Sequence, residues 1–313
     1  MENPVVQFQL MLKAISGMPY AAREKACDSI QFLLEDYIKI FPPVSIKTYT
    51  SLFSAMREFA GLFIQDKDVL ELGPGFSLGL VFLAALSGAR KAWAADLFPH
   101  NMGPDHDYIV SMYEHVAKNP RFLITMDQPW DVDRVTNEFA KLIDRDQQGR
   151  YSFRKSKIEY LFPFTGEKLP FDNEAIDVSL SCAAFEHFRE PAAVVRELSR
   201  ITRPAGVSCH IIDFRDHRDF TRPFEFLTMT ENAWQQFHSA SQSYTYTNRL
   251  RHSQVVSLFN DAGFRLLGVQ PSITGLLDKE VQARLVAPYT DIPVGELETL
   301  VQIYVFRKDH APT

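Results

Sequence analysis

The residues whose types and spacing most clearly suggest chemistry lie in the stretch 69–79. An apolar, β-prone run ends in an acid, Glu71, passes through the glycines Gly73 and Gly75, and continues into an apolar run of helical period over 80–86. Glycines in such a turn permit backbone conformations that a Cβ forbids and let a ligand approach the main chain closely. The first N–H groups of the following helix face the same ligand. The stretch therefore predicts a strand, a ligand-binding turn and a helix.

The departures of this turn from the known phosphate-binding patterns indicate its ligand. The dinucleotide fingerprint needs a third glycine three residues after the second, and Leu78 stands there. The phosphate-binding loop needs a lysine at its end, and the stretch has none. Glu71 repels a phosphate and attracts a cation or an amine. The turn therefore favours a cationic ligand over a nucleotide phosphate.

A second acid, Asp96, ends the next apolar run, 91–95. It lies about 20 residues beyond the glycine turn, where an acid in nucleotide-binding α/β folds accepts hydrogen bonds from the ribose hydroxyls. An aspartate at the end of a strand is common in itself. Its distance from Gly73 is what predicts a ribose contact.

The segment 71–75, Glu-Leu-Gly-Pro-Gly, resembles the first motif of class I S-adenosylmethionine (SAM) dependent methyltransferases, with Ser77 in place of that motif's third glycine. Further along, Leu-Pro-Phe at 169–171, a strand containing Asp-Val at 177–178 and the pair Glu-His at 186–187 resemble the family's later motifs, in the same order. The resemblance covers roughly residues 66–308, with gaps at insertions.

This resemblance implies a SAM cofactor and a Rossmann-like α/β fold with a seven-stranded, mostly parallel sheet. In the family an aspartate before the Leu-Pro-Phe run contacts the adenine amine, and here Thr165 falls at about that place. The cofactor-binding residues that the resemblance implies are Glu71, Gly73, Gly75, Ser77, Asp96, Thr165, Cys182, Ala183 and His187.

Alternating strand and helix patterns from residue 66 onward predict the parallel sheet that positions these residues. We expect a catalytic domain over 66–313, with strands at 157–161, 207–213, 264–269 and 300–306 and helices at 191–201 and 252–262. Residues 1–65 carry helical patterns at 5–15, 21–40 and 51–64, with a break at 41–43, and predict a helical extension or lid. The stretch of about 100–156 is too long for an ordinary connection and predicts an insertion on the substrate side.

Composition excludes several classes of function. A net charge of -6 and a pI near 5.9 disfavour binding to nucleic acid or to an anionic membrane. Three cysteines without paired spacing argue against a disulfide scaffold and a zinc site. No apolar run of about 18 residues and no charged-then-apolar leader is present. We therefore expect a soluble, cytoplasmic protein.

The richest cluster of reactive side chains follows the strand at 207–213. Since ligands of open α/β sheets lie at the carboxyl ends of the strands, we expect Asp213, Asp216 and His217 to be catalytic. An imidazole titrates near neutral pH, so His217 suits a general base. A loop held by salt bridges, or a metal site of these three residues, is the alternative, and we expect no metal. Further along, Tyr246, Asn248 and Arg249 are predicted to bind the substrate.

Three functions agree with these features. The first is a methyltransferase that acts on an oxygen or nitrogen of a small-molecule acceptor by in-line displacement. The second is a SAM-consuming cyclase resembling azetidine-2-carboxylate synthases, in which the cofactor's own amine attacks its γ-carbon and methylthioadenosine leaves. That reaction needs a weakened clamp on the amine at Glu71. The third is a non-catalytic protein with a SAM-binding fold.

Overall fold

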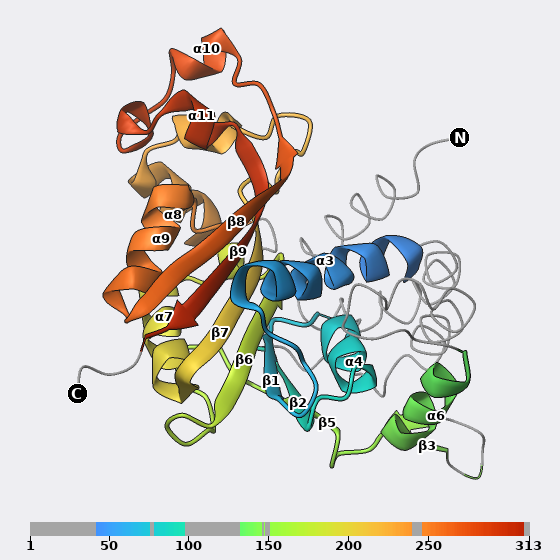
Figure 1. The fold of residues 1–313 in the computed structure, drawn as a ribbon. Coiled ribbons are helices and arrows are strands. Elements are labelled where there is room, and N and C mark those ends of the chain that lie inside the picture. Colours follow the sequence, from blue (N-terminus) through green and yellow to red (C-terminus); the bar gives the residue numbers. More distant parts are fainter. Residues whose placement is uncertain are drawn as a thin grey trace, which may run out of the picture.

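A single seven-stranded sheet organises the protein (Figure 1). The computed structural model describes residues 42–75, 78–97, 132–145, 147, 151–239 and 246–309. The strand order is β5-β2-β1-β6-β7-β9-β8, parallel from β5 to β7, while β9 runs antiparallel to both of its neighbours. The strands are β1 Asp68–Leu72, β2 Lys91–Ala95, β5 Ile158–Leu161, β6 Ile176–Cys182, β7 Thr202–Asp213, β8 Phe264–Thr274 and β9 Thr299–Lys308.

Helices cover both faces of this sheet. On one face α3 (Pro42–Ala60) packs against β7, β8 and β9, and α4 (Gly79–Leu86) packs against β1 and β2. On the other face α7 (Pro191–Ile201) and α9 (His252–Asp261) pack against β7 and β8. Neighbouring residues of β1 belong to different cores, Val69 to the first and Leu70 to the second. This alternation explains why β1 is buried along its whole length, as in parallel sheets covered on both sides.

Beyond the ends of β8 and β9 a group of short helices forms a third hydrophobic cluster (Figure 1). Trp234 and Phe226 lie at its centre, and both are buried. The helical segments of this part are η3 Glu225–Thr228, α8 Glu231–Ser239, α10 Lys279–Gln282, η4 Tyr289–Asp291 and α11 Val294–Leu297.

A small helix-and-hairpin unit precedes β5. It consists of α6 (Val132–Leu142), β3 (Ile143–Arg145) and β4 (Tyr151–Phe153), and the two strands pair antiparallel. The charge pattern alone predicts a helix up to Arg145, whereas the last three of these residues form β3. The rest of the expected insertion, residues 98–131, lies outside the described residues.

The predicted elements agree closely with the observed ones. The helix predicted at 191–201 is α7, with its proline in the first turn, where a missing N–H costs no hydrogen bond. The helix expected at 51–64 is longer at its start and ends earlier: α3 runs from Pro42 to Ala60, because prolines are tolerated in a first turn. Whether residues 41–43 separate it from a preceding helix stays a prediction, since residues 1–41 lie outside the described residues. The helices expected at 5–15 and 21–40 lie outside the described residues, and the division at residue 65 stays a prediction. No described helix is long and apolar enough to cross a membrane.

Candidate active site

The site lies where the direction of strand addition reverses. From β1 the chain adds β2 and β5 on one side, and then returns to add β6 and β7 on the other. In open α/β sheets ligands bind beyond the carboxyl ends of the strands at such a point. Here the turn after β1 meets the segment after β6, because a Cβ built on Gly73 would lie 2.6 Å from the Cβ of Ala184.

The glycine turn has the backbone that its composition predicts. Gly73 has a φ of 62° and Gly75 a φ of 58°, both in the left-handed region that favours glycine. The Gly73 N–H donates to the Ala95 carbonyl at 2.9 Å, which ties the turn to the end of β2. A Cβ built on Gly75 would meet no described atom within 4 Å. Gly73 is thus required by packing, while a side chain at Gly75 would meet none of the described atoms.

Glu71 lies beneath this turn and is only 2% exposed. Its carboxylate accepts a hydrogen bond from the N–H of Val81, in the first turn of α4, at 3.1 Å. The pKa of Glu71 is raised to about 8, chiefly by burial; the nearby carboxylate of Asp96 adds to this rise, and the Val81 N–H opposes it. Without a cation beside it, Glu71 is therefore mostly protonated at neutral pH.

Asp96 lies across the turn from Glu71 and is buried. Its Oδ2 accepts a hydrogen bond from the Gly75 N–H at 3.3 Å, so the carboxylate borders the open side of the turn. The Asp96 carbonyl accepts from the N–H of Phe164 at 2.8 Å, which brings the segment after β5 to the same edge. Thr165 follows directly and is exposed. The structure therefore brings these predicted cofactor residues together, whereas Ser77 lies outside the described residues.

The end of β6 connects this turn to a second group of side chains. Ala183 has a φ of 50°, and its N–H donates to the Ile211 carbonyl at 3.0 Å. Burial raises the pKa of the Cys182 thiol, and the charges of Glu71, Glu186 and Asp213 raise it further. The thiol therefore stays protonated and unreactive. Because the charges of Glu71, Glu186 and Asp213 all act on it, Cys182 lies between the glycine turn and a second group of side chains around Glu186.

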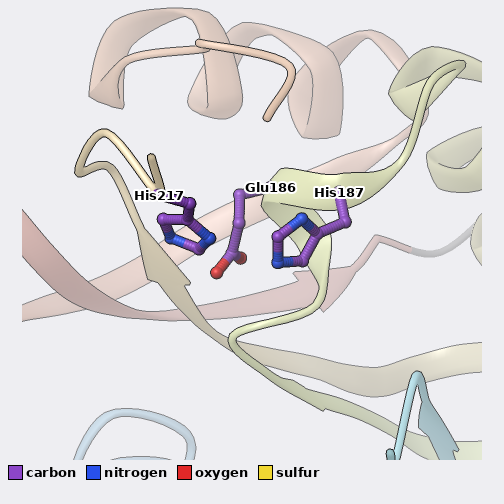
Figure 2. A group of neighbouring side chains, drawn as sticks. All are labelled: Glu186, His187 and His217. Atoms are coloured by element: carbon purple, nitrogen blue, oxygen red, sulfur yellow. The ribbon is translucent and has the colours of Figure 1, made fainter. Parts of the chain in front are cut away.

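This group consists of Glu186, His187 and His217, and is called the Glu-His-His cluster below (Figure 2). The first two belong to η2 (Phe185–His187), and His217 lies in the loop after β7. The Glu186 carboxylate points between the two imidazole rings (Figure 2). The ring centroids of the two histidines are 4.9 Å apart. Nε2 of His217 is 3.6 Å from Oδ2 of Asp213, the last residue of β7.

Burial controls the charges of this cluster. It raises the pKa of Glu186, and the neighbouring Asp213 carboxylate raises it further. Burial lowers the pKa of His187 to about 4, with a contribution from His217, so this imidazole is neutral at neutral pH. Burial opposes the ionisation of Asp213, but hydrogen bonding by Arg215 and the proximity of His217 outweigh it and lower its pKa.

Asp213, at the end of β7, and Asp216, in the loop that follows, each pair with an arginine. The Arg215 Nε donates to Oδ1 of Asp213 at 2.9 Å, and the Arg218 Nε donates to Oδ1 of Asp216 at 2.9 Å. Asp216 is almost completely buried. Asp216 therefore fits the alternative expectation of a loop held by salt bridges. Asp213 is also paired with an arginine, but it approaches His217 as well. A catalytic role for each of the three predicted residues stays a prediction.

The three predicted substrate residues hold η2 and its surroundings in place. The Tyr246 carbonyl lies 2.7 Å from Nδ1 of His187. The Asn248 N–H donates to the Glu186 carbonyl at 2.7 Å. Arg249 is buried and donates to the Met229 carbonyl at 2.7 Å. Tyr246 and Asn248 thus contact η2, whereas Arg249 bonds carbonyls of η3 and the residue after it. Contact of the three residues with a substrate stays a prediction.

Glu186 is the functional side chain that the sequence analysis left without a role. The signal available was its place beside His187, directly after a strand whose carboxyl end faces the site. The pattern does not reveal that its carboxylate turns toward a histidine 31 residues away (217 - 186).

A family model for the methyltransferase domain matches residues 136–209, from α6 into β7. With the sheet order and the motif order given above, this match indicates the class I, SAM-dependent family. Over this segment the chain is similar to a methyltransferase domain. The matched segment contains η2, whereas the glycine turn and His217 lie outside it.

Solved structures of low identity resemble this methyltransferase domain. A SAM-dependent methyltransferase from Mesorhizobium loti is 13% identical, with 81% of this chain and 96% of that chain covered and a TM-score of 0.41. SAM-dependent methyltransferases from Methanosarcina mazei give 14% identity, coverages of 79% and 94% and a TM-score of 0.40. The [4+2]-cyclase SpnF gives 12% identity, coverages of 84% and 81% and a TM-score of 0.42. At these scores the likenesses carry no argument, and no curated protein matches the chain.

The residues of the methyltransferase domain fit the SAM that its family indicates. Gly75 leaves open space over the turn, a buried acid at the end of β1 suits an ammonium, and Asp96 suits ribose hydroxyls. Glu71 and Asp96 are the residues that would hold the amino and sugar groups. This arrangement predicts a measurable proton release.

At pH 7, SAM binding is expected to release a proton from Glu71. A carboxyl with a pKa of about 8 is about nine-tenths protonated at pH 7, and a neighbouring ammonium lowers its pKa and drives the proton off. Calorimetric titration with SAM in two buffers of different ionisation enthalpy measures the number of protons released per SAM bound. Glu71→Gln keeps an acceptor for the Val81 N–H but has no proton to lose, so its release should fall to near zero. Equal release by both proteins would contradict the amine contact.

Proposed function

We propose that the protein transfers the methyl group of SAM to an oxygen or nitrogen of a small-molecule acceptor. The observation that carries this proposal is that Glu71 and Asp96 both lie at the glycine turn, bonded to the N–H groups of Val81 and Gly75, with the Glu-His-His cluster at the same edge of the sheet. Bound SAM supplies a methyl group on an electrophilic sulfonium. The chain's residues must align the acceptor, exclude water and take up a proton.

His217 is the residue proposed to take the acceptor's proton. Its side chain is largely buried, and Asp213 lies 3.6 Å from its Nε2. Because Arg215 keeps Asp213 ionised, that carboxylate stabilises the imidazolium formed when His217 accepts a proton. His187 is less suited to the task, since burial holds its pKa at about 4.

One observation favours the cyclase as the second function. Glu71 bonds the Val81 N–H, and burial raises its pKa to about 8, so a large part of it is neutral at physiological pH. A neutral acid holds the cofactor's amine weakly, and a free amine is what attack on the γ-carbon requires. The cyclase reaction needs no external acceptor, because the nucleophile is the cofactor's own amine.

The nucleoside product distinguishes these functions. The protein is incubated with SAM alone and with pools of small molecules that carry hydroxyl or amino groups, and the products are separated by chromatography with mass detection. S-adenosylhomocysteine formed only with an acceptor pool supports methyl transfer, and fractionation of that pool identifies the acceptor. Methylthioadenosine formed from SAM alone supports the cyclase. Absence of SAM binding in calorimetry would overturn both and favour the non-catalytic protein.

A further inference from the structure

The donor set of the Glu-His-His cluster matches that of a metal centre. One carboxylate oxygen of Glu186 and one ring nitrogen from each of His187 and His217 all lie within 4.8 Å of one another (Figure 2). Ligand atoms around a bound transition metal are roughly 3–3.5 Å apart, given bonds of about 2.1 Å. Small side-chain rotations would bring the three ligand atoms from within 4.8 Å of one another to the separation found around a metal. Two imidazoles and one carboxylate form the facial set that holds divalent first-row metals.

Glu186 supplies an independent observation that points to a cation. Its side chain is 2% exposed, and neither carboxylate oxygen has a hydrogen-bond partner among the described residues. A buried carboxylate without a partner is costly, and proteins normally pair such a group or use it to coordinate a metal. Arg215, whose charge lowers the pKa of Glu186, is already bonded to Asp213. The carboxylates of Glu186 and Asp213 therefore outnumber the one guanidinium beside them.

His187 is prepared as a ligand by its surroundings. Its Nδ1 donates to the Tyr246 carbonyl at 2.7 Å, since a carbonyl can only accept, so the neutral ring keeps its lone pair on Nε2. Histidines that bind metals commonly donate their other N–H to a backbone carbonyl in this way. The backbone of η2 is held by Asn248, which bonds the carbonyls of Glu186 and Phe185.

We propose that Glu186, His187 and His217 bind a divalent first-row transition metal ion at the carboxyl ends of β6 and β7. This proposal replaces the expectation of a metal-free site and uses a different set of residues from Asp213, Asp216 and His217. Three protein ligands leave coordination positions open for an oxygen of a bound molecule. If the proposed methyl transfer holds, on which this last step rests, that oxygen belongs to the acceptor. His217 then serves as a ligand, and the metal lowers the pKa of the acceptor oxygen.

Titration of the metal-free protein with Co²⁺ tests the site directly. Co²⁺ bound by two imidazoles and a carboxylate gives visible absorption bands, so binding is read without SAM and without activity. One equivalent should bind, and Glu186→Gln should weaken it by about 100-fold or more, since loss of outer-shell partners alone costs about 10–100-fold. Mg²⁺ should compete weakly, because imidazole ligands disfavour it.

Two controls keep this test decisive. His252→Gln removes a histidine of α9 that stacks on Tyr304, and it should leave Co²⁺ affinity unchanged. Thermal unfolding checks the fold of Glu186→Gln, whose amide has nearly the same size as the carboxyl group but never carries its charge. Equal Co²⁺ affinity in the wild type, Glu186→Gln and His252→Gln, or no binding by the wild type, would overturn the metal site. Co²⁺ binding without SAM binding would keep the metal site and overturn the proposed function.

Discussion

Replacing His217 by alanine is expected to lower kcat by about 100-fold or more, while SAM affinity stays near that of the wild type. Nε2 of His217 lies 3.6 Å from Oδ2 of the ionised Asp213, and His217 lies with Glu186 and His187 at the carboxyl ends of β6 and β7. None of its described contacts reaches the glycine turn, so cofactor binding should be spared. Steady-state kinetics with the identified acceptor, together with calorimetric titration with SAM, measures the two effects separately.

The pH profile then separates the two roles that His217 can have. If the imidazole is the base in the metal-free protein, the wild type should lose kcat as the pH falls and the imidazole becomes protonated, and His217→Ala should lose that limb. If the imidazole is a metal ligand, His217→Ala should also lose Co²⁺ binding. His252→Gln is the matched control and should behave as the wild type in every assay. Turnover of His217→Ala close to the wild-type value would remove the role of base, and wild-type Co²⁺ affinity of this variant would remove the role of ligand.

The glycine turn and its two acids were predictable because they depend on local sequence. Glycines at 73 and 75 were read as a turn, and both have positive φ angles. The acids Glu71 and Asp96 follow apolar runs, and parallel strands bring their carboxyl ends to one edge of the sheet. Pattern and spacing were sufficient here because each feature involves only a strand and the turn that follows it.

The partners of side chains in loops were not predictable in the same way. The acids at 213 and 216 look alike in the sequence, yet Asp216 is turned into a buried pair with Arg218, whereas Asp213 also reaches His217. The Glu-His-His cluster depends on how the parallel pairing of β6 and β7 aligns η2 with the following loop. Such contacts depend on tertiary packing, which no short motif encodes.

The roles of the residues near 246–249 depend on packing for the same reason. The polar and aromatic composition of this segment predicts substrate binding, which stays a prediction; in the structure the Tyr246 carbonyl and the Asn248 amide hold η2. Arg249 points away and donates to carbonyls at Phe226 and Met229. Polar residues in loops satisfy buried backbone groups as often as they bind ligands, because those groups need partners wherever water is absent.

Replacing Asp96 by alanine is expected to weaken SAM binding by roughly 1–3 kcal/mol, or about 5- to 150-fold, the range for losing a buried or charged hydrogen-bond partner. The carboxylate borders the open side of the turn, where its Oδ2 bonds the Gly75 N–H, and two oxygens on one side chain can accept from both ribose hydroxyls. Asp96→Asn keeps one acceptor for the Gly75 N–H, so its affinity for SAM should lie between those of the wild type and Asp96→Ala. Calorimetric titration measures the affinities.

Methylthioadenosine turns this measurement into a test of position, because it contains the ribose of SAM but lacks the amino-acid part. Asp96→Ala should weaken the binding of SAM and of methylthioadenosine by the same factor, since the sugar is common to both. Glu71→Gln, the matched variant at the other acid of the turn, should weaken SAM alone, because only SAM brings an ammonium to that carboxyl. Unchanged SAM affinity in Asp96→Ala would remove the ribose assignment. Loss of methylthioadenosine binding in Glu71→Gln would instead place the adenosine on the far side of the turn, against the buried end of β1.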